Sequence, residues 1–448
     1  MVLCLRQKEK KTGFKRRRRQ MEKKLPESLQ KLIKKVEEAF PEDPRMVQLF
    51  INCFTNTLDT TVKRLEDGTT YIITGDIPAM WLRDSVAQIR PYLMAAGEDK
   101  EIADMLVGLV RKQFFYVNLD PYANAFNQEA NGNCWEHDET DMLPWIWERK
   151  YELDSLCYPI QLAYLVWKNT GRTDHFDETF VKGVRRILEV WRTEQHHEER
   201  SPYHFVRKNC YFTDTLSRGG KGALVKSGTG LIWSGFRPSD DSCVYGYLIP
   251  SNMFAVVVLG YLAEIANQVL GDEALAAEAE AFRKEVKEAI ETLAVVKNEY
   301  YGRIYAYETD GYGQFLLMDD ANVPSLLSME YLGYDGDREV MENTRRFILS
   351  EGNPYYFKGK AAGGIGSPHV PPYYIWHIGL AVQGMTESSK EEKLRILQLM
   401  RDTDGGTGMM HEGFHVDDPT KFTREWFSWA NAVFCELVLD YCGVRVVR

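Results

Sequence analysis

Apolar residues recur every three or four positions along most of this 448-residue chain, a spacing that places them on one face of an α-helix. Gly97, Gly171 and Gly271 stand where three of the periodic segments end, as helix C-termini favour. The pattern predicts about a dozen helices, in the ranges 28–40, 44–64, 80–96, 100–117, 153–170, 176–195, 254–269, 272–294, 323–332, 338–350, 371–386, 389–401 and 423–441.

Two long segments depart from this pattern. Residues 200–249 and 298–318 carry Gly, Ser, Tyr and Thr in short runs, which predicts long loops or small hairpins. Regular β-branched runs between the helices are missing, so a β/α barrel is not expected. Helices joined by alternating short and long connections instead predict an all-α toroid, with the functional residues on its loop-rich end.

The composition indicates a soluble globular enzyme. Hydrophobic residues make up 44% and charged residues 27% of the chain, unlike a disordered protein, a collagen or a small disulfide scaffold. The longest apolar stretch, Met253–Leu262, is interrupted by Gly260, so we expect no membrane span. The eight cysteines are scattered without a C-x-x-C pair. This is typical of reduced thiols, and we expect a cytoplasmic protein without a cysteine-bound metal.

Positive charge is concentrated at the N-terminus. Residues 1–25 hold 11 of the 55 Lys and Arg residues and 2 of the 65 Asp and Glu residues. The rest of the chain therefore carries a net charge of about −19, which disfavours nucleic-acid binding. The Arg16–Arg19 run is typical of a nucleic-acid or membrane arm, but no apolar segment follows it as in a secretory signal. We favour a basic, disordered extension over residues 1–26, ahead of a single catalytic domain at 27–448.

Four clusters of polar and aromatic residues stand at expected loop-to-helix junctions. In the first, a Gly-Asp-x-Pro turn containing Asp76 enters a helix whose first turns carry Trp81, Arg83 and Asp84. An Arg beside an Asp presents donors and acceptors side by side to vicinal hydroxyls. A helix cap with a surface ion pair is the alternative interpretation.

The second cluster, 234–242, places the adjacent carboxylates of Asp240 and Asp241 after Arg237 and a proline. Adjacent Asp residues often bind a cation or cap a helix. The functional interpretation is a positioned acid, because a carboxyl that is desolvated or close to another carboxylate keeps its proton near neutral pH.

The third cluster contains a literal H-E-x-x-H sequence from His411 to His415, the pattern of zinc metalloproteases. That geometry requires a helix, whereas glycines precede and interrupt this segment, which is typical of a loop. We therefore expect no metal here. Glu412 is interpreted as a carboxylate in a Gly-rich loop ahead of an aromatic helix, with a solvated loop Glu as the alternative.

The fourth cluster places Asn322, His369 and Trp376 at two expected helix starts, where N-capping and core packing would also explain them. The chain has no P-loop, no dinucleotide-binding glycine motif after a strand and no Gly-x-Ser-x-Gly elbow. Carboxylates, aromatic rings and hydroxyl-binding groups remain, which is the equipment of glycoside hydrolysis.

The clusters together resemble glycoside hydrolase family 125, the exo-α-1,6-mannosidases, in five segments: GDIPAMWLRDS, SGFRPSDDSCVYGYLIPSNMFA, LMDDANVPSLLSMEYLG, SPHVPPYYIWHIGLAVQG and MHEGF. The resemblance runs from about residue 28 to about residue 442. It implies an (α/α)6 barrel, no metal or other cofactor, and an inverting mechanism. That mechanism would release non-reducing terminal mannose from oligosaccharides or N-glycan fragments.

The resemblance also implies roles for individual residues. In related inverting toroids the acid is an Asp in a Ser-Gly-x-Asp type of loop, and the base is a Glu in a Glu-x-Phe/Tyr loop. These places fall here on Asp240 and Glu412, with Asp241 as the rival acid. An inverting pair needs roughly 6.5–9.5 Å between its carboxyls to admit water, and the pKa of the acid must be raised relative to the base. The residues expected to bind substrate are Asp76, Trp81, Arg83, Asp84, Arg237, Asp241, Asn322, His369 and Trp376.

Long loops at 118–148 and 200–249 are expected to close the site into a pocket, so that the enzyme acts from chain ends. The expected partner is a mannose-containing oligosaccharide, without nucleic acid or membrane. Another inverting α-glycosidase on the same toroid, an α-glucosidase or a trehalase-like hydrolase, is the alternative.

Overall fold

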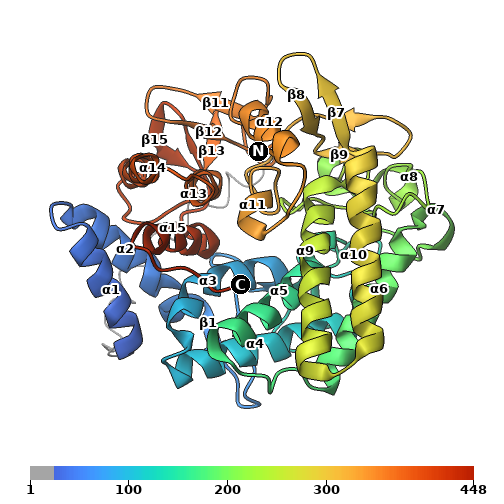
Figure 1. Cartoon of the computed structure of the whole chain (residues 1–448), viewed down its shortest axis with the longest axis horizontal. Helices are drawn as coiled ribbons and strands as arrows, with labels where there is room; N and C mark the ends of the chain where they lie inside the picture. The colour runs from blue at the N-terminus through green and yellow to red at the C-terminus, as the bar shows by residue number, and fades with distance from the viewer. Residues whose placement is uncertain (1–24) are drawn as a thin grey trace.

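The computed structural model describes residues 25–448, in which an inner ring of helices is enclosed by an outer ring (Figure 1). The expected N-terminal extension lies almost wholly outside the described residues. Outer and inner helices alternate along the chain in six pairs. The pairs are α2 (Pro44–Asn56) with α3 (Leu82–Ala96), α4 (Lys100–Leu119) with α5 (Leu153–Thr170), α6 (Glu178–Glu194) with α9 (Ile249–Ile265), α10 (Glu273–Leu293) with α11 (Met329–Leu332), α12 (Arg338–Ile348) with α13 (His377–Met385), and α14 (Lys390–Asp402) with α15 (Ser428–Tyr441).

This arrangement confirms the (α/α)6 barrel. The two rings differ in sequence because they differ in burial. Outer helix α12 carries an apolar stripe and a charged face, whereas inner helix α9 is apolar on nearly every side. An additional helix, α1 (Glu27–Ala39), packs against α2.

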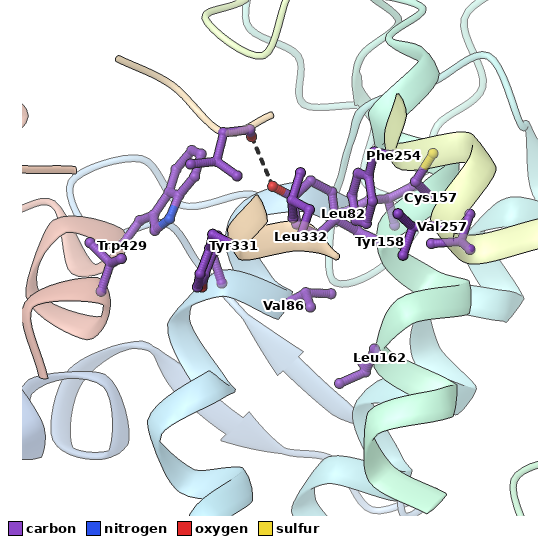
Figure 2. Close-up of a cluster of buried hydrophobic side chains, with 14 of the residues drawn as sticks. Leu82, Val86, Cys157, Tyr158, Leu162, Phe254, Val257, Tyr331, Leu332 and Trp429 are labelled. Atoms are coloured by element: carbon purple, nitrogen blue, oxygen red, sulfur yellow. Dashed lines mark hydrogen bonds between the residues drawn. The ribbon is translucent and has the colours of Figure 1, made fainter. Parts of the chain in front are cut away.

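The barrel axis is filled by side chains rather than open. Figure 2 shows this core, and the hydroxyl of Tyr158 donates a hydrogen bond of 2.8 Å to the carbonyl of Val323 within it. Because the centre is packed, a substrate site can form only at an end of the barrel. The labelled side chains of this core come from five inner helices and are Leu82, Val86, Cys157, Tyr158, Leu162, Phe254, Val257, Tyr331, Leu332 and Trp429.

Short antiparallel sheets lie at the N-terminal ends of three inner helices. Strand β3 (Met80–Trp81) leads into α3 and pairs with β4 (Ala125–Phe126), which pairs with β5 (Ile146–Glu148). Strand β6 (Tyr247–Leu248) leads into α9 and pairs with β9 (Glu308–Thr309), which pairs with β10 (Phe315–Leu316). Strand β13 (Tyr374–Trp376) leads into α13 and pairs with β14 (Gly413–His415), which pairs with β15 (Asp418–Phe422). The sheets fix the backbone where the inner helices begin.

The remaining strands form three hairpins. They are β1 (Val62–Arg64) with β2 (Thr70–Ile72), β7 (Val295–Asn298) with β8 (Gly302–Tyr305), and β11 (Tyr356–Lys358) with β12 (Gly363–Ile365). The segment 200–249 is mostly loop with two short helices, α7 (His197–Arg200) and α8 (Ser217–Gly220), nearby. The expected loops and small hairpins are therefore confirmed.

Several predicted helices are shorter than the apolar spacing indicates. The range 371–386 begins as strand β13, because Pro371 and Pro372 precede it and its backbone pairs with β14. The range 323–332 is helical only in α11, because the carboxylate of Asp319 accepts the backbone N–H groups of Leu326 and Leu327. Three further ranges are helical over only part of their length. The range 44–64 ends in a π-helical turn and strand β1, and the range 80–96 begins as strand β3. The range 423–441 begins with a non-helical segment ahead of α15.

The expectation of no membrane span is not tested by the structure, but one helix has the length and composition of a span. Within residues 25–448, one helical segment, Ile249–Leu270, is long and apolar enough to cross a membrane by length and composition. It consists of α9 and a π-helical turn that follows it. Helix α9 packs between α5 and α10, and 61% of the most apolar window is buried in the protein. Burial in the core thus accounts for its apolar sequence.

Candidate active site

A cavity opens where the inner helices begin, and it gathers residues from the whole length of the chain. Arg83 and Asp84 reach it from the first turn of α3, Trp376 from the end of β13, and Trp429 from the first turn of α15. Loops supply the rest. The lining residues are Thr74, Ile77, Trp81, Arg83, Asp84, Pro238, Ser239, Asp240, Asn322, His369, Trp376, Glu412, Arg424, Phe427 and Trp429.

The cavity brings together most of the site residues expected from the sequence. Both expected catalytic carboxylates line it, together with six expected substrate-binding residues. These eight are Asp240, Glu412, Trp81, Arg83, Asp84, Asn322, His369 and Trp376. The remaining three do not line it: Arg237 and Asp241 are buried, and Asp76 is exposed.

Arg237 is the clearest departure from expectation. Its guanidinium is buried, and its Nε donates a hydrogen bond of 2.6 Å to Oε1 of Glu308. The other oxygen of Glu308 accepts the backbone N–H groups of Val244 and Tyr245. Arg237 therefore anchors the 234–246 loop through Glu308, and it does not line the cavity; its contact with substrate stays a prediction.

The two adjacent aspartates point in different directions because the chain turns sharply between them. Asp240 has φ of 67°, a left-handed conformation that Asp tolerates better than most residues. The turn is closed by hydrogen bonds between the backbones of Arg237 and Asp241 and of Asp240 and Arg237. As a result the Asp240 side chain lines the cavity and is 28% exposed, whereas Asp241 is buried and accepts a hydrogen bond of 3.3 Å from Nδ1 of His369.

The Asp240 carboxylate lies in a dense cluster of charges around Arg83. Nη2 of Arg83 donates to Oδ1 of Asp240 at 3.1 Å, and Nη1 donates to Glu152, a fully buried residue just before α5. Asp154 and Asp84 lie 3.5 and 3.6 Å from the same guanidinium. One buried cation thus faces four carboxyl groups, which cannot all be ionised at low cost.

The proton affinities in this cluster differ from expectation. Burial opposes ionisation of Asp240, but Arg83 and a hydrogen bond with Glu152 outweigh it and hold the pKa of Asp240 below its usual range. Burial raises the pKa of Glu152 against the opposing charge of Arg83, and the Asp240 carboxylate raises it further. The expected high pKa therefore belongs to the partner of Asp240, which sequence reasoning missed.

The surroundings of Glu412 are simpler. The Glu412 carboxylate is almost fully buried, and its Oε1 lies 3.5 Å from Nη1 of Arg424. Arg424 is in turn held by Asp76, whose two oxygens accept hydrogen bonds of 3.2 Å from Nε. Asp76 therefore acts on the cavity through Arg424, which lies on its wall.

His369 is a second cation beside the carboxylates. Burial opposes its positive charge, but Asp241 and the nearby Glu412 and Asp240 carboxylates outweigh burial and raise the pKa of His369 to about 10. A protonated His369 at neutral pH offers a donor to a bound hydroxyl.

The H-E-x-x-H segment does not form a metalloprotease helix. His411 stacks on Phe422 and shares hydrogen bonds with Arg424 and Thr407, while His415 ends strand β14. Across residues 25–448, no group of three or more His, Cys, Asp or Glu side chains has an arrangement that could hold a metal ion. The expectation that this motif is not helical is confirmed, but its last three residues form strand β14 rather than a loop.

Several lining residues were not singled out from the sequence as binding residues. Arg424, Phe427 and Trp429 follow Glu412 closely along the chain, so their nearness to it was an available signal. Glu152 had no such signal, because the sequence around it resembles an ordinary helix start. Its place beside Asp240 is seen only in the structure, where Arg83 bonds both carboxyl groups.

A family profile and one relative match this chain over most of its length. The family profile described as metal-independent α-mannosidase, glycoside hydrolase family 125, matches residues 43–439. Meiotically up-regulated gene 157 protein of Schizosaccharomyces pombe is 39% identical over 442 residues, which span 92% of this chain and 85% of that protein.

Solved structures extend the comparison to three dimensions. A Streptococcus pneumoniae protein, described among metal-independent α-mannosidases and in a non-productive complex with α-1,6-mannobiose, is 52% identical with a TM-score of 0.91. The match covers 94% of this chain and 99% of that one. A bacterial glucoamylase complexed with acarbose, 15% identical over 89% of this chain and 56% of its own, has a TM-score of 0.59 and shares the fold.

Proposed function

The chain belongs to the metal-independent α-mannosidases of glycoside hydrolase family 125, and on this premise we propose that it is an inverting exo-α-1,6-mannosidase. The substrate is the non-reducing terminal mannose of an oligosaccharide or N-glycan fragment. The observation that carries the proposal is that Asp240 and Glu412, from segments 172 positions apart, line one cavity with aromatic walls.

In the proposed reaction the two carboxyl groups have opposite tasks. Asp240 gives a proton to the glycosidic oxygen as the bond to C1 breaks. Glu412 takes a proton from a water molecule as the water oxygen bonds to C1 from the opposite face, which inverts the configuration. Arg424 provides the counter-charge that an ionised Glu412 needs in a buried position.

The walls of the cavity supply unused polar groups for sugar hydroxyls. Nε1 of Trp81 and Nε1 of Trp376 are buried and have no hydrogen-bond partner within the described protein. Each indole can pack its face on the sugar and donate its N–H to a hydroxyl. Asp84 and Asn322 add acceptor and amide groups beside them.

The surrounding loops support action at chain ends. Segments 118–148 and 200–249 are joined by reciprocal backbone hydrogen bonds between Glu139 and Val206, and the second segment carries Asp240 into the cavity. The complex described for the pneumococcal relative, with α-1,6-mannobiose, supports the linkage that we propose.

The test is hydrolysis of α-1,6-mannobiose by the purified chain, followed by proton NMR from the first minutes. We expect β-mannose to appear first, because water attacks opposite the leaving group, and long α-1,6-linked chains to lose single mannoses from one end. First release of α-mannose would exclude inversion, and release of larger fragments would exclude exo action. Cleavage of glucobioses or trehalose in preference to mannobiose would favour the alternative glycosidase.

We also propose that the protein acts in the cytoplasm. The seven cysteines among the described residues are all free, which supports a reducing compartment. Fractionation of cells that carry the tagged full chain tests this, and recovery in a secreted fraction would contradict it.

A further inference from the structure

Asp240 lacks an evident way to hold its proton. The proposed function, on which this inference rests, requires a protonated acid, yet the hydrogen bond from Nη2 of Arg83 to Oδ1 of Asp240 favours the ionised form. The structure must therefore supply something that keeps a proton at this position.

Glu152 is placed to do so. It is fully buried, and it shares two donors with Asp240. The guanidinium of Arg83 bonds both carboxyl groups, one through each Nη atom. Nδ2 of Asn124 contacts both as well, at 3.1 Å from Glu152 and 3.3 Å from Asp240. The orientation of this amide is fixed, because its Oδ1 accepts the backbone N–H of Lys150.

We propose that Glu152 and Asp240 form a carboxyl pair that holds one proton between them. Glu152 is thereby the positioning residue that keeps the general acid protonated. Two carboxyl groups that share donors in a buried site cannot both ionise cheaply, so the last proton is retained to higher pH than either group alone would keep it.

The cations around the pair oppose a second proton, and the further carboxyl groups nearby oppose loss of both. Arg83 and Lys150 are the cations closest to it, and Lys150 contacts the backbone carbonyl of Asp240 at 2.7 Å. His369 adds a third positive group on the cavity side. The titratable groups that face the pair, from every element packed against it, are Arg83 and Asp84 of α3, Glu148 of β5, Lys150, Asp154 of α5, Asp214, Asp241 and His369.

The proton balance of one turnover is complete with water as the second substrate. The proton of the pair moves through Asp240 to the glycosidic oxygen as the C1–O bond breaks. Glu412 takes one proton from the attacking water. Release of that proton to solvent and return of a solvent proton to the pair restore the starting state.

The decisive measurement is the basic limb of the pH profile of kcat/KM on α-1,6-mannobiose, because that limb reports loss of the acid's proton. In Glu152→Gln, Asp240 is left alone with Arg83, so we expect the limb to move to lower pH by about one unit or more. At neutral pH the loss should be at least about 10-fold on mannobiose and smaller on an aryl mannoside with an activated leaving group.

A second variant moves the limb the other way. Ser155 Oγ donates a hydrogen bond of 2.7 Å to Oε2 of Glu152 and has no side-chain contact with Asp240. Ser155→Ala removes a donor that favours the ionised pair, so the limb should move to higher pH. This small change also keeps the test available if Glu152→Gln does not fold.

The matched control is Asp154→Asn, which removes another buried carboxyl beside the same guanidinium, 3.5 Å from Nη1 of Arg83, that shares no hydrogen-bond donor with Asp240 beyond Arg83. Its limb should move less than that of Glu152→Gln. An unmoved limb in Ser155→Ala, or in a folded Glu152→Gln, would overturn the carboxyl pair. Asp240→Asn separates this failure from failure of the proposed function: an active Asp240→Asn rejects the acid itself, whereas an inactive one with unmoved limbs in the other variants rejects only the pair.

Discussion

The two carboxyl groups proposed as acid and base each face a guanidinium, but only Asp240 shares its guanidinium with a second carboxyl group that contacts the same donors. On one side Asp240 shares its donors with a second carboxyl group, Glu152. On the other side Glu412 faces a cation, Arg424, which is itself held by Asp76. A neighbouring carboxyl group favours retention of a proton, and a neighbouring guanidinium balances a negative charge. This difference supports the proposed assignment of Asp240 as acid and Glu412 as base, which residue type alone does not provide.

The largest effects should come from removing each carboxyl in turn. Asp240→Asn and Glu412→Gln should each lose about 10²–10⁴-fold in kcat/KM on α-1,6-mannobiose. The two losses should differ on an aryl mannoside with an activated leaving group, because such a substrate needs less protonation. Asp240→Asn should then recover much of its activity, whereas Glu412→Gln should not.

Two further measurements sharpen this contrast. Azide should partly restore Glu412→Ala, because a small anion can replace the activated water, and it should not restore Asp240→Asn. Asp241→Asn serves as the matched control at the neighbouring position. If Asp241→Asn is dead on the disaccharide while Asp240→Asn remains near wild type, the acid is Asp241 and the assignment drawn from the cavity lining is wrong.

The next effect tests the base side through its cation. Arg424→Gln should lower kcat/KM by up to about 10²-fold, because Glu412 loses the group that positions and balances it. Asp76→Asn should lose less, since Arg424 remains next to Phe427 with its guanidinium 4.1 Å from that ring. Steady-state kinetics of both variants would measure this order. Equal activity of Arg424→Gln and the wild type would remove Arg424 from the proposed mechanism.

A smaller effect concerns stability. Because the pKa of His369 is raised from 6.5 to about 10 in the folded protein, its ion pair with Asp241 stabilises the fold fully below about pH 6.5 and is lost as the pH rises towards 10. The free energy of unfolding of Asp241→Asn should therefore lie below that of the wild type near neutral pH, and the difference should shrink towards pH 10. Urea unfolding at several pH values would measure it.

The control for this measurement is Ser239→Ala in the same loop, because the Ser239 hydroxyl has no hydrogen-bond partner in the described protein. Its difference from the wild type should not change with pH. A difference for Asp241→Asn that stays constant or grows between neutral pH and pH 10 would contradict a protonated His369.

The smallest expected effect is that of a chelator. Hydrolysis should be unchanged by excess chelator, because the proposed mechanism uses two carboxyl groups and the H-E-x-x-H segment lies in a loop and a strand. Loss of activity that calcium or zinc restores would contradict this.

Most of the fold was predictable because each helix produces a regular spacing of apolar residues in its own segment of the sequence. Helix α5 begins and ends at the predicted residues 153 and 170, and α1, α10 and α14 lie within one residue of prediction at each end. The errors share one cause: an apolar residue just before a helix has the same spacing whether it continues the helix or pairs in a strand. Trp81 and Trp376 both stand at the end of such a strand.

The candidate site was predictable where each residue belongs to a compact motif, and this covers Asp240, Glu412 and Arg83. The contacts of Arg237 and Glu152 were not predictable, because each depends on one charged residue that is distant in the sequence. Arg237 is drawn away from the cavity by Glu308, 71 positions further along the chain. Glu152 gains its place near the acid only when α3 and α5 bring Arg83 between the two carboxyl groups.

The sequence by itself determined the helical periodicity, the loop-rich end and the set of residue types available for chemistry, because these depend on local spacing and side-chain identity. Only the tertiary structure decided which member of the Asp240-Asp241 pair faces the cavity and which carboxyl groups share a cation. Orientation in a tight turn and proton affinity in a buried cluster are set by groups far apart in the chain, and their interaction exists only once the fold has removed water from between them.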